Sequence, residues 1–277
     1  MKLLKKYQYI LWMGGILVCL IFLFVGLIFG IATKNYGERD TLNPQFSAGK
    51  KSDSRMQSEP TSPVDIKAPV QSSDGTLKML AESADAGQSY LDGLTFMLDS
   101  QLSSVKDGGI IKNSNIWPGP DGTIPASSLG SCTVVFPGDG SVVSAINAAM
   151  ISKPEKLLIC VGRDGISDSV EDGFISSYTA LIKGIQSASP DTVIICTSII
   201  PVTSAYSGGA FSNGSIISAN EWIKTVCTDT GVYFADIAQA VSTNGVLNQD
   251  LCGNDGCTLN SSGISKILEY IRTHAIS

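Results

Sequence analysis

The sequence predicts an α/β domain in which helices cover both faces of a mostly parallel sheet. Three observations support this prediction. Short apolar runs, without the alternation typical of a half-exposed strand, recur between residues 94 and 236. Stretches with apolar residues three and four positions apart lie between these runs. Several runs end in Gly, Pro, Asp or Ser, the residue types that form turns.

The apolar runs are the expected strands. Because they are continuous rather than alternating, they suit strands that are covered on both faces. They are Leu94–Leu98, Thr133–Phe136, Lys156–Val161, Thr192–Ile200 and Gly231–Asp236.

The stretches between the runs are the expected helices, over residues 141–151, 174–187, 217–228 and 264–273. In the second of them, Tyr178, Leu181, Ile182 and Ile185 would share one face. Strands that alternate with helices favour a three-layer α/β/α sandwich. Ligands of such folds lie at the carboxyl ends of the strands. Residues 99–100, 162–164 and 255–258 would all lie on that side.

The N-terminal segment, residues 1–33, is predicted to be a membrane anchor. No charged residue occurs from Tyr7 to Thr33. At about 1.5 Å per residue this run can cross a hydrocarbon core of about 30 Å as a helix. Lys2, Lys5 and Lys6 precede it, which places the N-terminus in the cytoplasm. A cleaved signal peptide is the alternative, although its apolar core is usually only about 7–15 residues long.

Residues 34–75 are rich in Ser, Pro, Asp, Lys, Gly and Gln, and large apolar residues are few. Such a stretch cannot bury enough surface to offset its ordering entropy, so we interpret it as a flexible stalk. The folded domain is then 76–277, outside the cytoplasm in a single-pass protein of the cell membrane. The net charge of −6 and the absence of a Lys/Arg cluster after the stalk argue against nucleic acid as a partner.

The chain has seven cysteines and one histidine, His274. Cys160 and Cys196 lie in apolar runs and are expected to be buried core residues. Cys252 and Cys257 bracket a short turn and are either bridged locally or free. No His cluster, carboxylate pair or CxxC spacing predicts a metal, and Gly138–Gly140 is too short for a phosphate-binding loop, so we expect no cofactor.

Three segments of the domain contain candidate functional side chains. The first strand ends in Asp99-Ser100, a plain turn or helix cap when taken alone. A later strand ends in Gly162-Arg163-Asp164, and the segment before the last helix reads Asp255-Gly256-Cys257-Thr258-Leu259. Arg163 is expected to point away from its neighbour Asp164 into solvent.

From about Ser89 to the C-terminus these segments, with the elements between them, resemble the SGNH (GDSL-type) hydrolases. The resemblance implies a flavodoxin-like α/β/α fold and makes Ser100 the nucleophile, with its N–H as one oxyanion donor. Gly122 would offer a second N–H, unless it is a plain turn glycine. Gly162 and Asp164 match the block whose asparagine donates to the oxyanion. Leu98 stands where a glycine is usual.

Two catalytic positions also depart from this family's pattern. Asp164 replaces the asparagine, and an ionised carboxylate has no proton to donate. Thr258 occupies the position of the catalytic histidine, while Asp255 matches the residue that orients it. Threonine cannot act as a general base near neutral pH, and His274 is expected on the terminal helix, away from Ser100.

These features leave two functions from different classes. The first is an ester hydrolase on acylated surface glycans, peptidoglycan or small esters, with weak or absent activity because two catalytic positions are replaced. The second is a pseudoenzyme that binds a carbohydrate or cell-wall ligand in the same cleft. A structural surface domain that binds no ligand is the third option. The sequence does not predict the oligomeric state.

Overall fold

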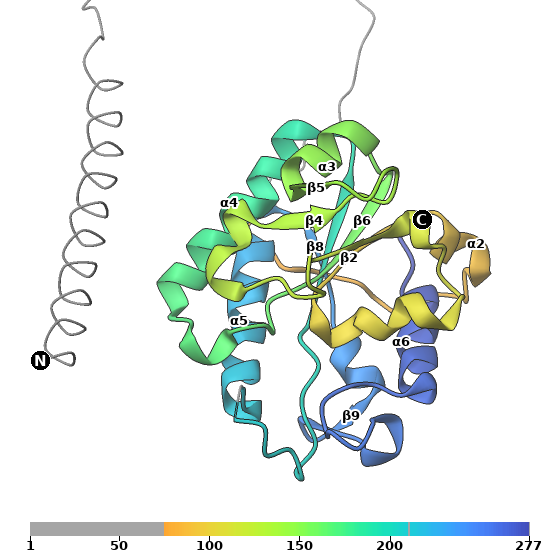
Figure 1. Cartoon of the computed structure of the whole chain (residues 1–277), viewed down its shortest axis with the longest axis vertical. Coiled ribbons are helices and arrows are strands. Elements are labelled where there is room, and N and C mark those ends of the chain that lie inside the picture. The colour runs from red at the N-terminus through yellow and green to blue at the C-terminus, as the bar shows by residue number, and fades with distance from the viewer. Residues whose placement is uncertain (1–74, 210, 277) are drawn as a thin grey trace, which may run out of the picture. The chain divides into compact units, whose positions relative to one another are not determined.

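A computed structural model describes residues 75–209 and 211–276, and its centre is a parallel sheet of six strands (Figure 1). Their order across the sheet is β1-β8-β7-β6-β2-β3, and every neighbouring pair is parallel. The strands are β1 (Lys78–Met79), β2 (Leu94–Leu98), β3 (Ile116–Pro118), β6 (Lys156–Cys160), β7 (Val193–Thr197) and β8 (Tyr233–Ala235).

The strand order shows where this sheet can form a site. Strand β2 lies between the edge strand β3 on one side and β6, β7 and β8 on the other, which is the flavodoxin-like order with β1 as an additional edge strand. The direction of winding reverses between β2 and β6. Chains leaving two such strands diverge, which opens a crevice at their carboxyl ends.

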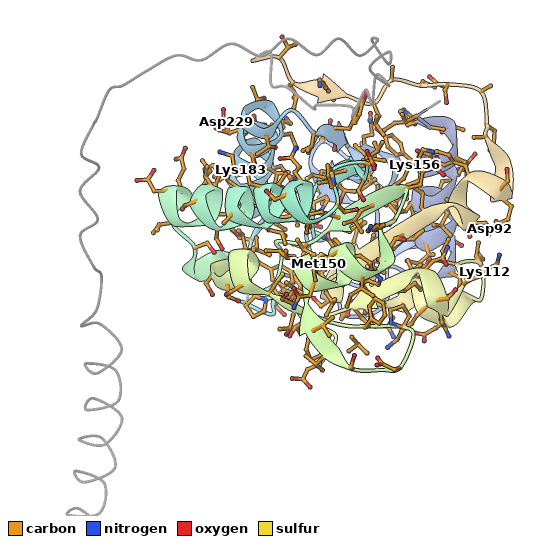
Figure 2. All side chains as sticks on the ribbon, turned by 90° about the horizontal axis from the view of Figure 1, so that it is seen from above. Asp92, Lys112, Met150, Lys156, Lys183 and Asp229 are labelled. Carbon is orange, nitrogen blue, oxygen red and sulfur yellow. The ribbon has the colours of Figure 1, made fainter. Side chains whose placement is uncertain are left out.

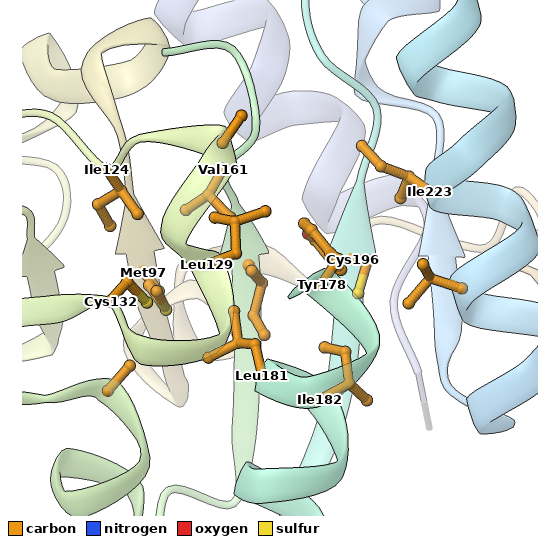
Figure 3. Packing of buried hydrophobic residues seen from close by; sticks show 14 of the residues in the cluster. Met97, Ile124, Leu129, Cys132, Val161, Tyr178, Leu181, Ile182, Cys196 and Ile223 are labelled. Carbon is orange, nitrogen blue, oxygen red and sulfur yellow. The ribbon is translucent and has the colours of Figure 1, made fainter. Parts of the chain in front are cut away.

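Three helices cover one face of the sheet: α3 (Ala145–Ser152), α4 (Glu171–Ala188) and α5 (Asn213–Thr230). Figure 3 shows Tyr178, Leu181 and Ile182 of α4 packed between the strands and Ile223 of α5. All four side chains are fully buried. Burial of one apolar side chain of this size contributes about 1.5–3 kcal/mol, so this layer holds α4 and α5 firmly against the sheet.

The opposite face is covered by α2 (Gly87–Asp92), α6 (Ser261–Thr273) and η1, a 3₁₀ segment over Ser100–Gly108. Helix α6 buries Ile264, Ile267, Leu268 and Ile271 against this face. It begins at Asn260, whose side chain accepts a hydrogen bond from the Gly263 N–H at 3.0 Å. The predicted three-layer arrangement with a parallel sheet is therefore confirmed.

Several segments differ from the sequence prediction. The predicted strand at 133–136 is β4 (Thr133–Val135), which pairs antiparallel with β5 (Val142–Ser144) in a separate hairpin. The helix predicted from 141 begins only at Ala145 because β5 precedes it and Ser144 caps it. Strand β7 ends at Thr197, before the apolar loop that follows it. The short edge strands β1 and β3 carry too few residues for a pattern to emerge.

Most charged side chains lie on the outside of the described domain, and Asp99 and Arg163 are buried exceptions. Lys183 on α4 and Asp229 on α5 are exposed, and Figure 2 shows both at the periphery. Lys112 Nζ lies 3.4 Å from Asp92 Oδ2 in a surface ion pair. Such pairs contribute little to stability, so apolar burial carries the fold.

The predicted anchor (1–33) and nearly all of the predicted stalk (34–75) lie outside the described residues. Among residues 75–209 and 211–276, we find no helix that is long and apolar enough to cross a bilayer. The six described cysteines are all free thiols, and Cys160 and Cys196 are buried as predicted. Cys252 and Cys257 are therefore not bridged; the Cys252 thiol donates instead to the Gly253 carbonyl at 3.1 Å.

Candidate functional site

The crevice between β2 and β6 holds three of the predicted site residues together. Ser100 follows β2 and begins η1, while Gly162 and Asp164 follow β6. Strands β2 and β6 pair in register up to Leu98 and Cys160, so the two chain segments leave the sheet side by side. The parallel register thus brings Ser100 next to a residue that is 64 positions further along the chain.

Asp99 fixes the position of both segments. It is fully buried, and its Oδ2 accepts hydrogen bonds from the N–H groups of Gly162 at 3.0 Å and Arg163 at 2.9 Å. Its Oδ1 accepts from the Gln101 N–H at 3.0 Å. Burial raises the pKa of Asp99 to about 6, and the nearby carboxylate of Asp164 acts in the same direction. Arg163 and the backbone N–H groups oppose this rise without cancelling it.

The Asp164 carboxylate holds the donors that an oxyanion would need. Its Oδ2 accepts from the Ser100 N–H at 3.2 Å and from the Ile124 N–H at 2.9 Å. Its Oδ1 accepts a short hydrogen bond from the Ser100 hydroxyl. The carbonyl of Asp164 also accepts from the Ala126 N–H at 2.7 Å, which ties the 124–126 segment to this strand end. The Asp164 carboxylate therefore lies where the negative charge of an oxyanion would develop during ester hydrolysis.

Arg163 points into the site, so the expectation of a solvated surface arginine is wrong. Only 2% of its surface is exposed, and its Nη2 donates to Ser100 Oγ at 3.1 Å. Its Nη1 donates to the Cys257 carbonyl at 3.0 Å, and its guanidinium lies 5.1 Å from the centre of the Phe211 ring. Gly162 has φ of +121°, which redirects the chain so that the next side chain turns back over Ser100.

The predicted glycine donor is engaged elsewhere. Gly122 has φ of +73° and its N–H donates to the Gly119 carbonyl at 2.9 Å within a turn. The N–H that faces the site from this segment belongs to Ile124, two residues further on. The Gly162 N–H is bound to Asp99 and is not available to a ligand. Sequence reasoning had no signal for Ile124, because every residue other than proline carries the same backbone donor.

Asp255 and Thr258 form one turn near Arg163. The Asp255 Oδ1 accepts from the N–H groups of Cys257 at 3.0 Å and Thr258 at 2.9 Å. Partial burial raises the pKa of Asp255, but hydrogen bonds from Thr258 and Cys257 outweigh it and lower the pKa to about 2. Burial raises the pKa of the Cys257 thiol, and the Asp255 charge adds to this rise. Both effects keep Asp255 ionised and Cys257 protonated near neutral pH.

The single histidine lies away from this cluster. His274 follows α6, where its ring stacks on Tyr270 at a centroid distance of 3.7 Å. Its Nδ1 lies 2.9 Å from the Tyr270 carbonyl and 3.3 Å from the Thr273 hydroxyl. The hydrogen-bond partners of Ser100 Oγ in the described structure are Asp164 and Arg163. No imidazole is therefore positioned to take the proton of Ser100.

This arrangement is poorly suited to nucleophilic attack. The Ser100 hydroxyl donates to a carboxylate, which is a weak base, and its oxygen accepts from a guanidinium, which never accepts a proton. A tetrahedral oxyanion would need the two N–H groups that Asp164 already occupies, and its charge would be repelled.

The described residues offer no candidate metal centre, since they contain no group of three or more His, Cys, Asp or Glu side chains able to hold an ion. The two carboxylates at the centre of the site, Asp99 and Asp164, already bind backbone N–H groups. They are oriented for those donors and not for a shared cation.

Comparison with known proteins gives structural neighbours only. No family model matches the sequence, and no curated protein matches it. A putative lipolytic protein of the G-D-S-L family from Desulfitobacterium hafniense is 16% identical, with a TM-score of 0.48 over 66% of this chain and 100% of the other. A carbohydrate esterase family 3 protein from Talaromyces cellulolyticus is 16% identical, with a TM-score of 0.40 over 70% and 94%.

The periplasmic domain of a lipopolysaccharide acetyltransferase from Salmonella ser. Paratyphi A is 14% identical, with a TM-score of 0.41 over 65% of this chain and 82% of the other.

Proposed function

We propose that this domain has the fold of an SGNH-type ester hydrolase but hydrolyses esters weakly or not at all. One observation carries the proposal: the Asp164 carboxylate occupies both backbone donors beside Ser100, and a guanidinium occupies the Ser100 oxygen. Loss of a triad member alone lowers turnover by about 10⁴–10⁶-fold. Here the base and the oxyanion donor are both replaced.

A second candidate function is the binding of a carbohydrate or cell-wall ligand without catalysis. A cavity of about 460 Å³ lies beside η1 and is partly lined by Ser and Asn side chains and an Asp. A folded cleft without a working nucleophile can still hold a ligand, because binding needs no base. We favour an acylated surface glycan or a cell-wall polymer as that ligand.

The proposed location is the outer side of the cell membrane, with the N-terminus in the cytoplasm. The charge-free run from Tyr7 to Thr33, preceded by lysines, supports this. A protein held there by residues 1–33 would meet surface glycans directly.

Turnover of a chromogenic acetyl ester tests the proposed impairment. The full-length protein and its Ser100→Ala variant are compared with 4-nitrophenyl acetate in detergent. We expect the same slow rate for both, because background hydrolysis then accounts for it. A wild-type rate well above that of Ser100→Ala would show that Ser100 works as a nucleophile and would overturn the proposal.

A further inference from the structure

The described domain has a groove between η1 and the start of α6 that none of the assigned residues uses. Its volume is about 460 Å³, within the range of small-ligand sites. In Figure 1 the yellow segment after β2, which includes η1, lies beside α6. The residues that matter are Ser104, Asp107, Ile110, Leu259, Ile264 and Ser265.

Two chain segments of the groove continue from the Ser100 site. Ser104 lies about one turn beyond Ser100 in η1, and Leu259 directly follows Thr258. These two connections make the groove a candidate for a second unit of a chain-like ligand.

Two polar groups of the groove have no partner within the described structure. The Ser104 hydroxyl is buried and makes no hydrogen bond. The exposed Asp107 carboxylate has neither a hydrogen bond nor an ion pair among the described residues. The Ser104 oxygen is shielded from solvent, so a ligand in the groove would pair with the Asp107 carboxylate and not with this hydroxyl. The exposed carboxylate favours a ligand that donates hydrogen bonds, as a sugar hydroxyl does.

The rest of the lining is apolar. Leu259 and Ile264 are buried beneath the groove at 3% and 6% exposure. Ile110 is 40% exposed at its rim, an unusual position for a large apolar side chain. The C–H face of a sugar ring can pack on such side chains while its hydroxyls donate to Asp107.

The charge of the lining excludes other ligand classes. Asp107 is the one charged side chain among the residues that line the groove in the described structure, so phosphates and carboxylates would be repelled. A purely apolar ligand would desolvate Asp107 without giving it a hydrogen bond. A neutral polyhydroxylated ligand donates to Asp107 and covers the apolar floor.

We propose that the groove between η1 and α6 binds a neutral sugar unit of an oligosaccharide. This inference deepens the proposed function, since it assigns a subsite to the glycan ligand, and it does not require any reaction at Ser100. Asp107 accepts hydroxyl hydrogen bonds, and Ile110 covers the ring.

A neighbouring groove provides the matched control. It has a volume of about 390 Å³, lies on the other side of η1, and is lined by Lys106, Asn113, Pro118 and Phe136 among others. Lys106 and Asp107 are adjacent exposed residues of the same 3₁₀ segment that line different grooves. A change at Lys106 therefore controls for general effects on η1.

The experiment measures binding of chitotriose, cellotriose and xylotriose to the full-length protein by saturation-transfer NMR and calorimetry. The detergent must lack a sugar headgroup, and each sugar is tested up to about 10 mM, where a weak single site begins to saturate. We expect at least one trisaccharide to bind. Asp107→Asn should weaken its binding about tenfold, because a hydrogen bond to a charged acceptor is replaced by a neutral one.

Ser265→Trp should abolish binding by filling the groove from the exposed face of α6, whereas Lys106→Ala should leave the affinity unchanged. The inference is wrong if no trisaccharide binds, if Asp107→Asn and Ser265→Trp bind as the wild type does, or if trilysine binds in their place. Binding is measured without turnover. An active Ser100 would thus refute the proposed impairment and leave this subsite standing, while an inert protein that binds no sugar would refute the subsite alone.

Discussion

Restoring the two replaced positions should restore chemistry at Ser100. Thr258→His places an imidazole after Asp255, whose Oδ1 already accepts the N–H of residue 258 at 2.9 Å. Asp164→Asn removes the carboxylate from the oxyanion donors and supplies an amide that can donate. A neutral amide also holds the two backbone N–H groups less strongly, so a substrate carbonyl can compete for them.

The size of the gain follows from the two effects. An oxyanion donor is worth about 10²–10³ in kcat, and a triad base about 10⁴ or more. Members of a triad act as a unit, so each single variant should gain little. Arg163 also holds the Ser100 oxygen at 3.1 Å and must yield to the new imidazole, which reduces the gain. We expect the double variant to exceed either single variant by at least about 100-fold.

The assay is hydrolysis of 4-nitrophenyl acetate by the full-length protein at neutral pH. The wild type, both single variants and the double variant are compared, and Ser100→Ala is added to the double variant as a control. The gain should disappear in that control. A double variant no faster than the single variants, although it is folded, would refute the assignment of residues 164 and 258 to the oxyanion and base positions.

Three further predictions concern stability. As the pH rises from about 4 to about 6, the stability of the wild type relative to Asp99→Asn should fall by about 2 kcal/mol, because the folded state holds a proton that the unfolded state releases. Urea denaturation at several pH values measures this, and a flat difference would mean that folding leaves the pKa of Asp99 unchanged. Arg163→Met should lower the free energy of unfolding by about 2–3 kcal/mol, since two hydrogen bonds of a buried guanidinium are lost. An unchanged urea midpoint would contradict the burial of Arg163. Gly162→Ala should destabilise the protein more than Gly122→Ala does. The change at Gly122 costs about 1–2 kcal/mol of stability for its positive φ alone, whereas at Gly162 a Cβ would also lie 3.2 Å from the Phe174 side chain. Equal thermal midpoints of the two variants would refute this close packing.

The sequence predicts the sheet well because its signal is apolar burial. Strand β2 begins and ends at the predicted residues, and β6 differs from the prediction by one residue. Strand β3 was missed because its three residues lie among turn residues and a proline, and it is held by pairing with β2. Such pairing is a long-range interaction that a local pattern does not contain.

The site residues could be predicted from the sequence only where the side chain itself would take part in the chemistry. Ser100 and Asp164 were predicted from the family resemblance of the segments that carry them, and they lie in contact. The direction of Arg163 depends on the positive φ of Gly162 and on two backbone hydrogen bonds that Asp99 accepts, and Asp99 is more than 60 residues away in the chain. No local pattern encodes such a contact, and the Ile124 donor has no side-chain signature at all.

Labelling of Ser100 by a fluorophosphonate probe tests the central claim most directly, because the probe reports the reactivity of the hydroxyl whatever the natural ligand is. Intact-mass spectrometry of the full-length protein after incubation gives the labelled fraction. Held between Asp164 and Arg163, Ser100 should remain unmodified. A covalent adduct on the wild type that is absent from Ser100→Ala would contradict the account.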